Sequence, residues 1–168
     1  YIIRGTPMLV QILIIYFGLG QMLRPTGFRW LNIGGTFTAG TVALSLNAGA
    51  YMAEIVRGGI EAVDKGQIEA ARSLGLTYGK TMKKIVLPQA LRTMLPSIIN
   101  QFIISIKDTS LLSVIGLTEL TNVGKTIAAT QSAHMMVIYC FMACYYLFIC
   151  TVLAQVSKVV EKRLSYGK

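Results

Sequence analysis

The sequence predicts an all-α fold, a polytopic α-helical membrane protein, and three features of the 168-residue chain support this prediction. Only 14% of its residues are charged, against about 25% in soluble domains. Long runs without charge recur along the chain, and most basic residues gather in one loop and at the C-terminal end. A soluble bundle of unusually apolar helices is the alternative.

The uncharged runs give the number of expected membrane spans. A helix crosses a bilayer with roughly 17–25 residues, and the chain contains four runs of this order, one of them interrupted by Lys107 and Asp108. We therefore expect a single transmembrane domain over residues 1–168. Its expected spans are approximately 5–23, 33–56, 95–117 and 135–157, with a loop over 57–94 between the second and third.

The placement of basic residues predicts the orientation in the membrane. A net charge of +9 would suggest a nucleic-acid partner for a soluble protein, but in membrane proteins basic residues mark the cytoplasmic side. The 57–94 loop is rich in Lys and Arg, so we expect this loop and the C-terminus in the cytoplasm. Four basic residues follow the fourth run: Lys158, Lys162, Arg163 and Lys168. The remaining loops carry three: Arg24, Arg29 and Lys125.

The start of the sequence lies close to an expected membrane edge. The first residue is Tyr1 rather than Met, and Arg4 directly precedes the first uncharged run. We therefore expect at least one helix ahead of this segment. Nearby, Tyr16, Phe28 and Trp30 are candidates for the aromatic residues that mark membrane–water interfaces.

The central loop is expected to form a helix on the cytoplasmic surface. Residues 67–76 suit a short helix, on which Ala71 and Gly75 are four apart and would share a face of small residues. Another protein's backbone could approach closely there. A second helical piece is expected through Lys84, and Pro88 marks a turn back towards the membrane. The alternative is an amphipathic connector that rests on lipid headgroups.

The order of residues in this loop resembles the EAA motif of the permease subunits of bacterial type I ABC importers. Glu-Ala-Ala is followed after three residues by Gly, and nine residues later by an Ile-x-Leu-Pro ending. The matching positions are Glu69, Ala70, Ala71, Gly75, Ile85, Leu87 and Pro88. Residues 4–11, 47–60 and 100–116 are similar to the polar amino-acid branch of that family, and the segment after Asn122 is matched mainly by hydrophobicity.

This resemblance implies a permease subunit in the bacterial inner membrane that moves polar amino acids into the cytoplasm. The EAA loop would be a coupling helix that docks on a separate ATP-binding subunit. Further implied partners are a second permease chain, identical or paralogous, and a periplasmic or lipid-anchored amino-acid-binding protein. The ATP and magnesium would belong to the ATP-binding subunit, since this sequence has no Gly-x4-Gly-Lys-Ser/Thr phosphate loop. We expect no cofactor, metal or catalytic residue on this chain.

Polar residues within the expected spans are candidates for a substrate pathway. A charge at mid-membrane costs about 2.5–3.5 kcal/mol on insertion scales and usually has a function or a partner. A zwitterionic amino acid would offer a carboxylate to Lys107 and an ammonium group to Asp108. Four of the candidates, at offsets of four, four and three, line one side of a helix. The candidates are Asn47, Glu54, Ser97, Gln101, Ser105, Lys107 and Asp108.

Other interpretations of these charges stay open at this point. In a structural network, Lys107 would pair with Glu54 or with a helix C-terminal carbonyl, and Asp108 would cap a helix break; gating is a third possibility. In a self-contained ion-coupled secondary transporter or channel, the two charges would carry the ion or proton path. A membrane enzyme is disfavoured because the sequence shows no catalytic set, and the cysteines and His134 lack the spacing of a metal site.

Overall fold

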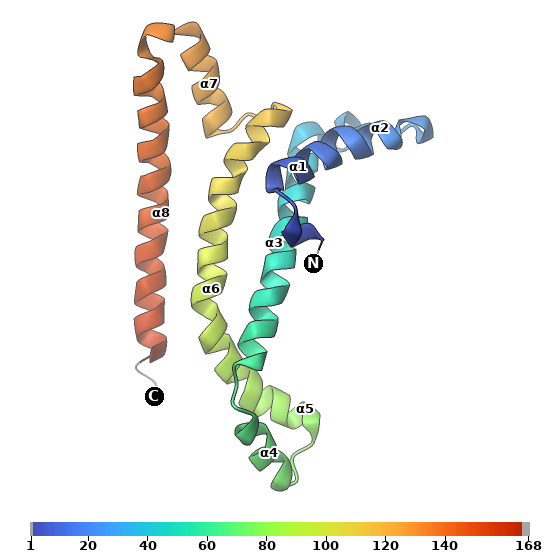
Figure 1. Ribbon diagram of the computed structural model, residues 1–168, viewed down its shortest axis with the longest axis vertical. Helices are drawn as coiled ribbons and strands as arrows, with labels where there is room; N and C mark the ends of the chain where they lie inside the picture. The colour runs from blue at the N-terminus through green and yellow to red at the C-terminus, as the bar shows by residue number, and fades with distance from the viewer. Residues whose placement is uncertain (1, 166–168) are drawn as a thin grey trace. The chain divides into compact units, whose positions relative to one another are not determined.

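The computed structural model describes residues 2–165, and within them every regular element is helical, which confirms the predicted all-α class. Lys168, one of the basic residues used for the orientation, lies outside this range. The α-helices are α1 (Met8–Leu13), α2 (Gly20–Met22), α3 (Gly35–Glu61), α4 (Lys65–Ser73), α5 (Tyr78–Thr81), α6 (Leu87–Asp108), α7 (Leu120–Thr130) and α8 (Met135–Ser165) (Figure 1). Two π-helical segments, η2 (Ile14–Leu19) and η5 (Met82–Val86), join neighbouring helices. The 3₁₀ segments are η1 (Ile3–Gly5), η3 (Arg24–Thr26), η4 (Trp30–Ile33), η6 (Thr109–Ile115) and η7 (Ser132–His134).

Each of the four predicted spans falls on a helix. By length and hydropathy, two helices within residues 2–165 are long and apolar enough to cross a membrane, Tyr78–Ile115 and Ser132–Val159. The helix Met8–Met22 is apolar but shorter, and α3 is 27 residues long but carries many small and polar residues. That all four segments cross the bilayer stays a prediction.

The chain divides into two compact units, which we describe separately. The first unit comprises Tyr1–Ala50 and Ile103–Val152. Its core consists of Ile12, Ala43, Leu112 and Ile115, so that α1, α3 and η6 meet there. In the same unit α7 and the first half of α8 form a hairpin, in which Thr121 and the Tyr146 hydroxyl lie 3.3 Å apart (Figure 1).

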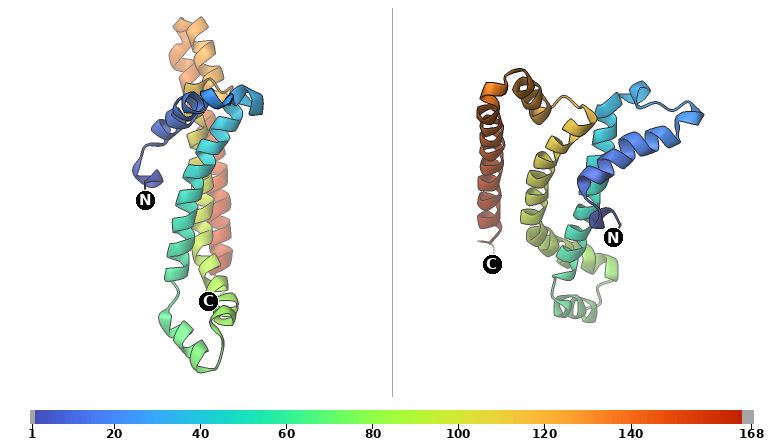
Figure 2. Two further views of the ribbon diagram at one scale, coloured as in Figure 1. Left: turned by 90° about the vertical axis from the view of Figure 1, so that its right-hand side faces the viewer. Right: turned by 45° about the horizontal axis from the view of Figure 1, so that its top comes forward.

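The second unit comprises Tyr51–Phe102 and Leu153–Lys168. Its core consists of Val63, Val86, Ala90 and Met94, with isoleucines of α3 and α4 packed against them. Gly59 is the point of closest approach between α3 and α6, since a Cβ there would lie 3.0 Å from the Cβ of Met94. Figure 2 shows from two sides how α4 and α5 bridge the end of α3 and the start of α6.

The predicted turn at Pro88 is a bend in the helix and not an interruption of it. The backbone is helical without a break from Tyr78 through η5 into α6, although the axis changes direction between α5 and α6 (Figure 1). Proline removes one backbone donor from a helix. The π-helical turn η5 directly before it provides a local irregularity of the kind that accommodates such a loss and bends a helix.

Candidate functional site

The site that the sequence singles out is the α4–α5 hairpin (residues 65–81) with the start of α6. α4 begins at Lys65, two residues earlier than expected, because Asp64 caps it: the carboxylate accepts a 2.7 Å hydrogen bond from the backbone N–H of Gly66. It ends at Ser73, three residues earlier than expected. The hairpin is therefore built from a well-capped helix of nine residues rather than from residues 67–76.

The early end of α4 is explained by the backbone of Gly75. Gly75 has φ of +83°, in the left-handed region that favours glycine. Its N–H donates to the Arg72 carbonyl (3.0 Å), and the Leu76 N–H donates to the Ala71 carbonyl (3.1 Å). These two bonds form a Schellman motif, which satisfies carbonyls left over at a helix C-terminus. The glycine of the motif is thus required by the turn.

The predicted docking face of small residues is wrong. Ala71 is only 3% exposed because it packs inside the second unit, and Gly75 lies beyond the end of the helix. Glu69 and Ala70 are exposed instead. Leu74 is 85% exposed, so a large apolar side chain stands at the tip of the hairpin.

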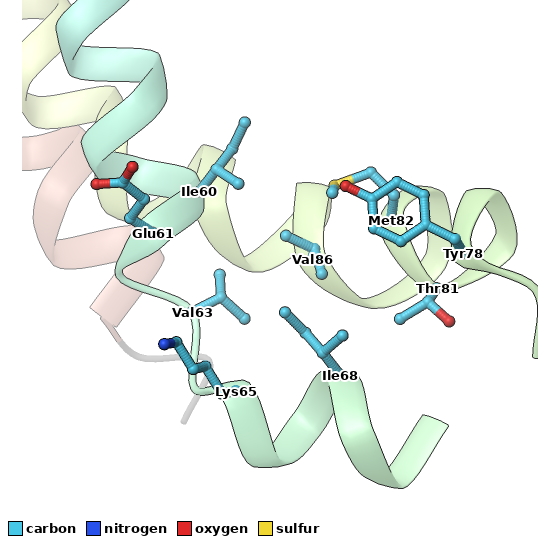
Figure 3. Close-up of a pocket in the computed structure, with 9 residues that line it drawn as sticks. All are labelled: Ile60, Glu61, Val63, Lys65, Ile68, Tyr78, Thr81, Met82 and Val86. Carbon is cyan, nitrogen blue, oxygen red and sulfur yellow. The ribbon is translucent and has the colours of Figure 1, made fainter. Parts of the chain in front are cut away.

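The side of the hairpin that faces its own unit borders a partly open hollow of about 540 Å³ (Figure 3). In Figure 3, Val63, Ile68 and Val86 point toward one another from three segments of the chain. Glu61 and Lys65 lie at one edge of the hollow. The apolar side of the hairpin is thus turned toward its own unit, and the charged side is left exposed.

The closing residues of the motif lie on the continuous helix that follows the hairpin. Ile85 is half-buried on η5, whereas Leu87 and Pro88 are exposed at the start of α6. The Gln89 side-chain amide donates to the Ile85 carbonyl (3.1 Å). These positions therefore belong to the helix rather than to a turn.

Asn47, a candidate for the substrate pathway, is the buried end of a polar network in the first unit. It is 7% exposed, and its amide donates a 3.0 Å hydrogen bond to the Gln11 side-chain oxygen. The Gln11 amide nitrogen donates in turn to the hydroxyl and carbonyl oxygens of Thr6 (2.8 and 3.0 Å). Sequence reasoning missed Gln11, although a glutamine in the interior of an apolar run was a signal that could have found it.

The other polar candidates differ in how exposed their side chains are. In the second unit Gln101 is 6% exposed, while Ser97 and Glu54 are exposed. In the first unit Ser105 and Asp108 are half-buried, and Lys107 is exposed. A shared site for these seven residues stays a prediction.

The alternative in which Asp108 caps a helix break is not what the structure shows. At Asp108 the α-helix tightens into the 3₁₀ helix η6 without interruption, and the Asp108 side chain makes no capping hydrogen bond. The hydroxyls of Thr109 and Ser110 donate to the carbonyls of Ile106 and Lys107, both at 2.7 Å. These bonds satisfy carbonyls that the change of helix type would leave open.

A second polar cluster, which sequence reasoning missed, holds the hairpin of α7 and α8 in the first unit. Glu119 caps α7 by accepting from the backbone N–H groups of Thr121 (2.8 Å) and Asn122 (2.6 Å). The Tyr146 hydroxyl of α8 donates to the same carboxylate at 3.3 Å. Lys125 donates to the Ser113 hydroxyl at 2.9 Å, which ties α7 to η6.

Comparison with known proteins places these features in a family. Residues 1–166 match the family model of the binding-protein-dependent transport system inner membrane component. The glutamine transport system permease protein GlnP of Escherichia coli is 45% identical over 163 residues, which cover 97% of this chain and 71% of that protein. The arginine transport system permease protein ArtQ of Bacillus subtilis is 40% identical, with the same coverage of both chains.

Two solved structures are similar as well. The structure of an amino acid ABC transporter with histidines has a TM-score of 0.86 at 40% identity, over 96% of this chain and 72% of that chain. The MetNI methionine ABC transporter in inward-facing conformations has a TM-score of 0.69 at 18% identity, over 95% and 71% of the two chains. At that identity the second similarity indicates the fold alone.

Proposed function

Because the chain belongs to the family of inner membrane components of binding-protein-dependent transport systems, we propose that it conducts polar amino acids across the membrane, driven by a separate ATP-binding subunit that docks on the α4–α5 hairpin. The substrate class is supported by relatives named for glutamine and arginine transport. Mg-ATP would be bound by the ATP-binding subunit. A binding protein would deliver the substrate, and a second permease chain would complete the pathway.

The proposed docking of the ATP-binding subunit rests on one observation, the exposed tip of the hairpin. Leu74 is 85% exposed, next to a helix whose apolar side is already packed against Val63 and Val86. The Asp64 cap and the Schellman motif at Gly75 fix both ends of α4. A short rigid helix with an apolar tip and charged flanks is well suited to enter a groove on a soluble protein.

Docking is tested by co-purification of the chain with its ATP-binding subunit in detergent. Burying a leucine is worth about 1.5–3 kcal/mol, so Leu74→Asp should weaken the complex roughly tenfold to a hundredfold. Leu74→Met keeps an apolar side chain and should retain the complex. Thr77→Asp is a charge-matched control, since Thr77 is exposed at the N-cap of α5, where Asp is well tolerated. Normal recovery of the Leu74→Asp complex would rule out docking through this tip.

Transport is tested in proteoliposomes with the ATP-binding subunit and the binding protein. Uptake of glutamine, arginine and cystine should each be compared with and without ATP. We expect ATP-dependent uptake of at least one polar amino acid, which Asp108→Asn reduces while the complex stays intact. Uptake that follows an ion gradient without the ATP-binding subunit would instead support a secondary transporter.

A further inference from the structure

The first unit contains a second hollow, of about 510 Å³, and none of its lining residues belongs to the hairpin or to the candidates for the substrate pathway. It lies where the apolar helix Met8–Met22 ends and the segment before α3 begins. Its lining combines two arginines with four aromatic residues: Arg24, Arg29, Tyr16, Phe17, Phe28 and Trp30. This combination is typical of neither a packed core nor an ordinary water-exposed loop.

The hollow is held in shape by Trp30. The indole N–H of Trp30 donates a 3.0 Å hydrogen bond to the Tyr16 carbonyl in the π-helical segment η2. Gly20 leaves room for the ring, since a Cβ there would lie 3.0 Å from the indole Cδ1 and Nε1. Phe28 packs edge-on against Trp30, with ring centroids 5.0 Å apart. The aromatic wall is thus anchored to the helix that it faces.

The two arginines give the hollow its charge. Both side chains are exposed, and within residues 2–165 neither guanidinium has a hydrogen bond or ion pair. They flank a hollow without an acidic lining residue. Arginine binds phosphate oxygens with paired N–H groups. A phosphate group would therefore supply the negative charge that the two arginines lack in this hollow.

The neighbouring side chains favour a lipid over a soluble anion or an acidic protein. Met22 and Leu31 are 70% and 82% exposed beside the arginines, and Phe17 is 55% exposed on the helix. Large apolar side chains next to arginine and tryptophan, at the end of an apolar helix, are typical of the depth at which headgroups meet acyl chains. An acidic protein surface would match the charges but would leave these apolar side chains without a partner.

We propose that this hollow binds the headgroup of an anionic phospholipid, with Arg24 and Arg29 on the phosphate, Trp30 and Phe28 as the wall, and Met22 and Leu31 along the acyl chains. A basic residue near an anionic membrane surface contributes about 1 kcal/mol. Loss of each arginine should therefore lower the preference for anionic lipid about fivefold.

The site carries its own probe, because Trp30 is the single tryptophan of the chain. The chain is reconstituted in mixed bilayers in which either phosphatidylglycerol or phosphatidylcholine carries brominated acyl chains, and quenching of Trp30 fluorescence is measured. We expect brominated phosphatidylglycerol to quench more strongly at equal mole fraction. Arg24→Gln with Arg29→Gln should remove this preference, whereas Arg24→Lys with Arg29→Lys should keep part of it. Arg57→Gln with Arg92→Gln, which removes the same two charges at exposed sites on the second unit, should leave it unchanged.

Equal quenching by the two lipids in the unmodified chain would overturn the proposal and favour an acidic protein partner. Loss of the preference on addition of inorganic phosphate would also overturn it, since the site would then take the free anion. Loss of the preference in Arg57→Gln with Arg92→Gln would show that net charge, and not this hollow, selects the lipid.

Discussion

Replacing Gly75 with alanine tests the turn that ends α4. A Cβ at Gly75 would meet nothing within 4 Å, so the substitution is free of clashes, but φ stays at +83°. An L-residue in this left-handed region costs about 1–2 kcal/mol relative to glycine. Local opening of the turn should therefore become roughly fivefold to thirtyfold more frequent.

Gly79 provides the matched control for this prediction. A Cβ at Gly79 also meets nothing within 4 Å, but the residue lies in α5 with helical backbone. Gly79→Ala should therefore stabilise the hairpin by about 0.5–1 kcal/mol. Gly75→Asn should fall between the glycine and alanine proteins, because asparagine tolerates the left-handed region better.

The assay is amide hydrogen exchange of the chain in detergent, read at the two N–H groups of the Schellman motif. The N–H of residue 75 bonds to the Arg72 carbonyl, and the Leu76 N–H bonds to the Ala71 carbonyl. Both should exchange faster in Gly75→Ala, and neither should do so in Gly79→Ala. Unchanged exchange in Gly75→Ala, or equal changes in both variants, would refute the argument from backbone conformation.

Two further predictions concern the cores of the units. Gly59→Leu should lower stability by about 1–3 kcal/mol through overpacking, because its Cβ would press on Met94. Gly58→Leu should have little effect, because a Cβ there meets nothing within 4 Å. Thermal unfolding in detergent compares the two variants, and equal losses of stability would contradict the packing described. Asn47→Leu should cost about 1 kcal/mol because it removes the hydrogen bond to the half-buried Gln11 side chain. In the same assay the double substitution Asn47→Leu with Gln11→Leu should cost less than the sum of the two single changes, and simple additivity would count against a direct bond.

Much of the fold could be predicted because membrane helices can be recognised from their local composition. Uncharged runs identified the apolar helices, and the fixed spacing from Glu69 to Pro88 identified the hairpin and the family. These signals depend on residues that are near in sequence. They need no knowledge of which helix packs against which.

The errors came from features that depend on backbone conformation or on distant contacts. The sequence predicts a small surface residue at Gly75, because its positive φ is invisible there. It predicts an exposed Ala71, but the burial of this residue depends on packing within the second unit. It predicts a turn at Pro88, because the adjacent π-helical segment that accommodates the proline has no simple sequence signature. The bond between Asn47 and Gln11 joins residues 36 positions apart, beyond any local pattern.

The unbroken helix from α5 into α6 has a mechanical consequence. Large hinge motions need loop residues that absorb a change in φ and ψ, and none lies between Tyr78 and Phe102. A displacement of α5 therefore cannot be absorbed by rotation about a flexible loop. It must appear as bending, which is favoured where the regular hydrogen-bond ladder is interrupted, at η5 with Pro88 and again at Pro96 inside α6. These two places divide the helix into stiffer pieces, so stiffening either of them would alter how far a push on the hairpin travels along α6.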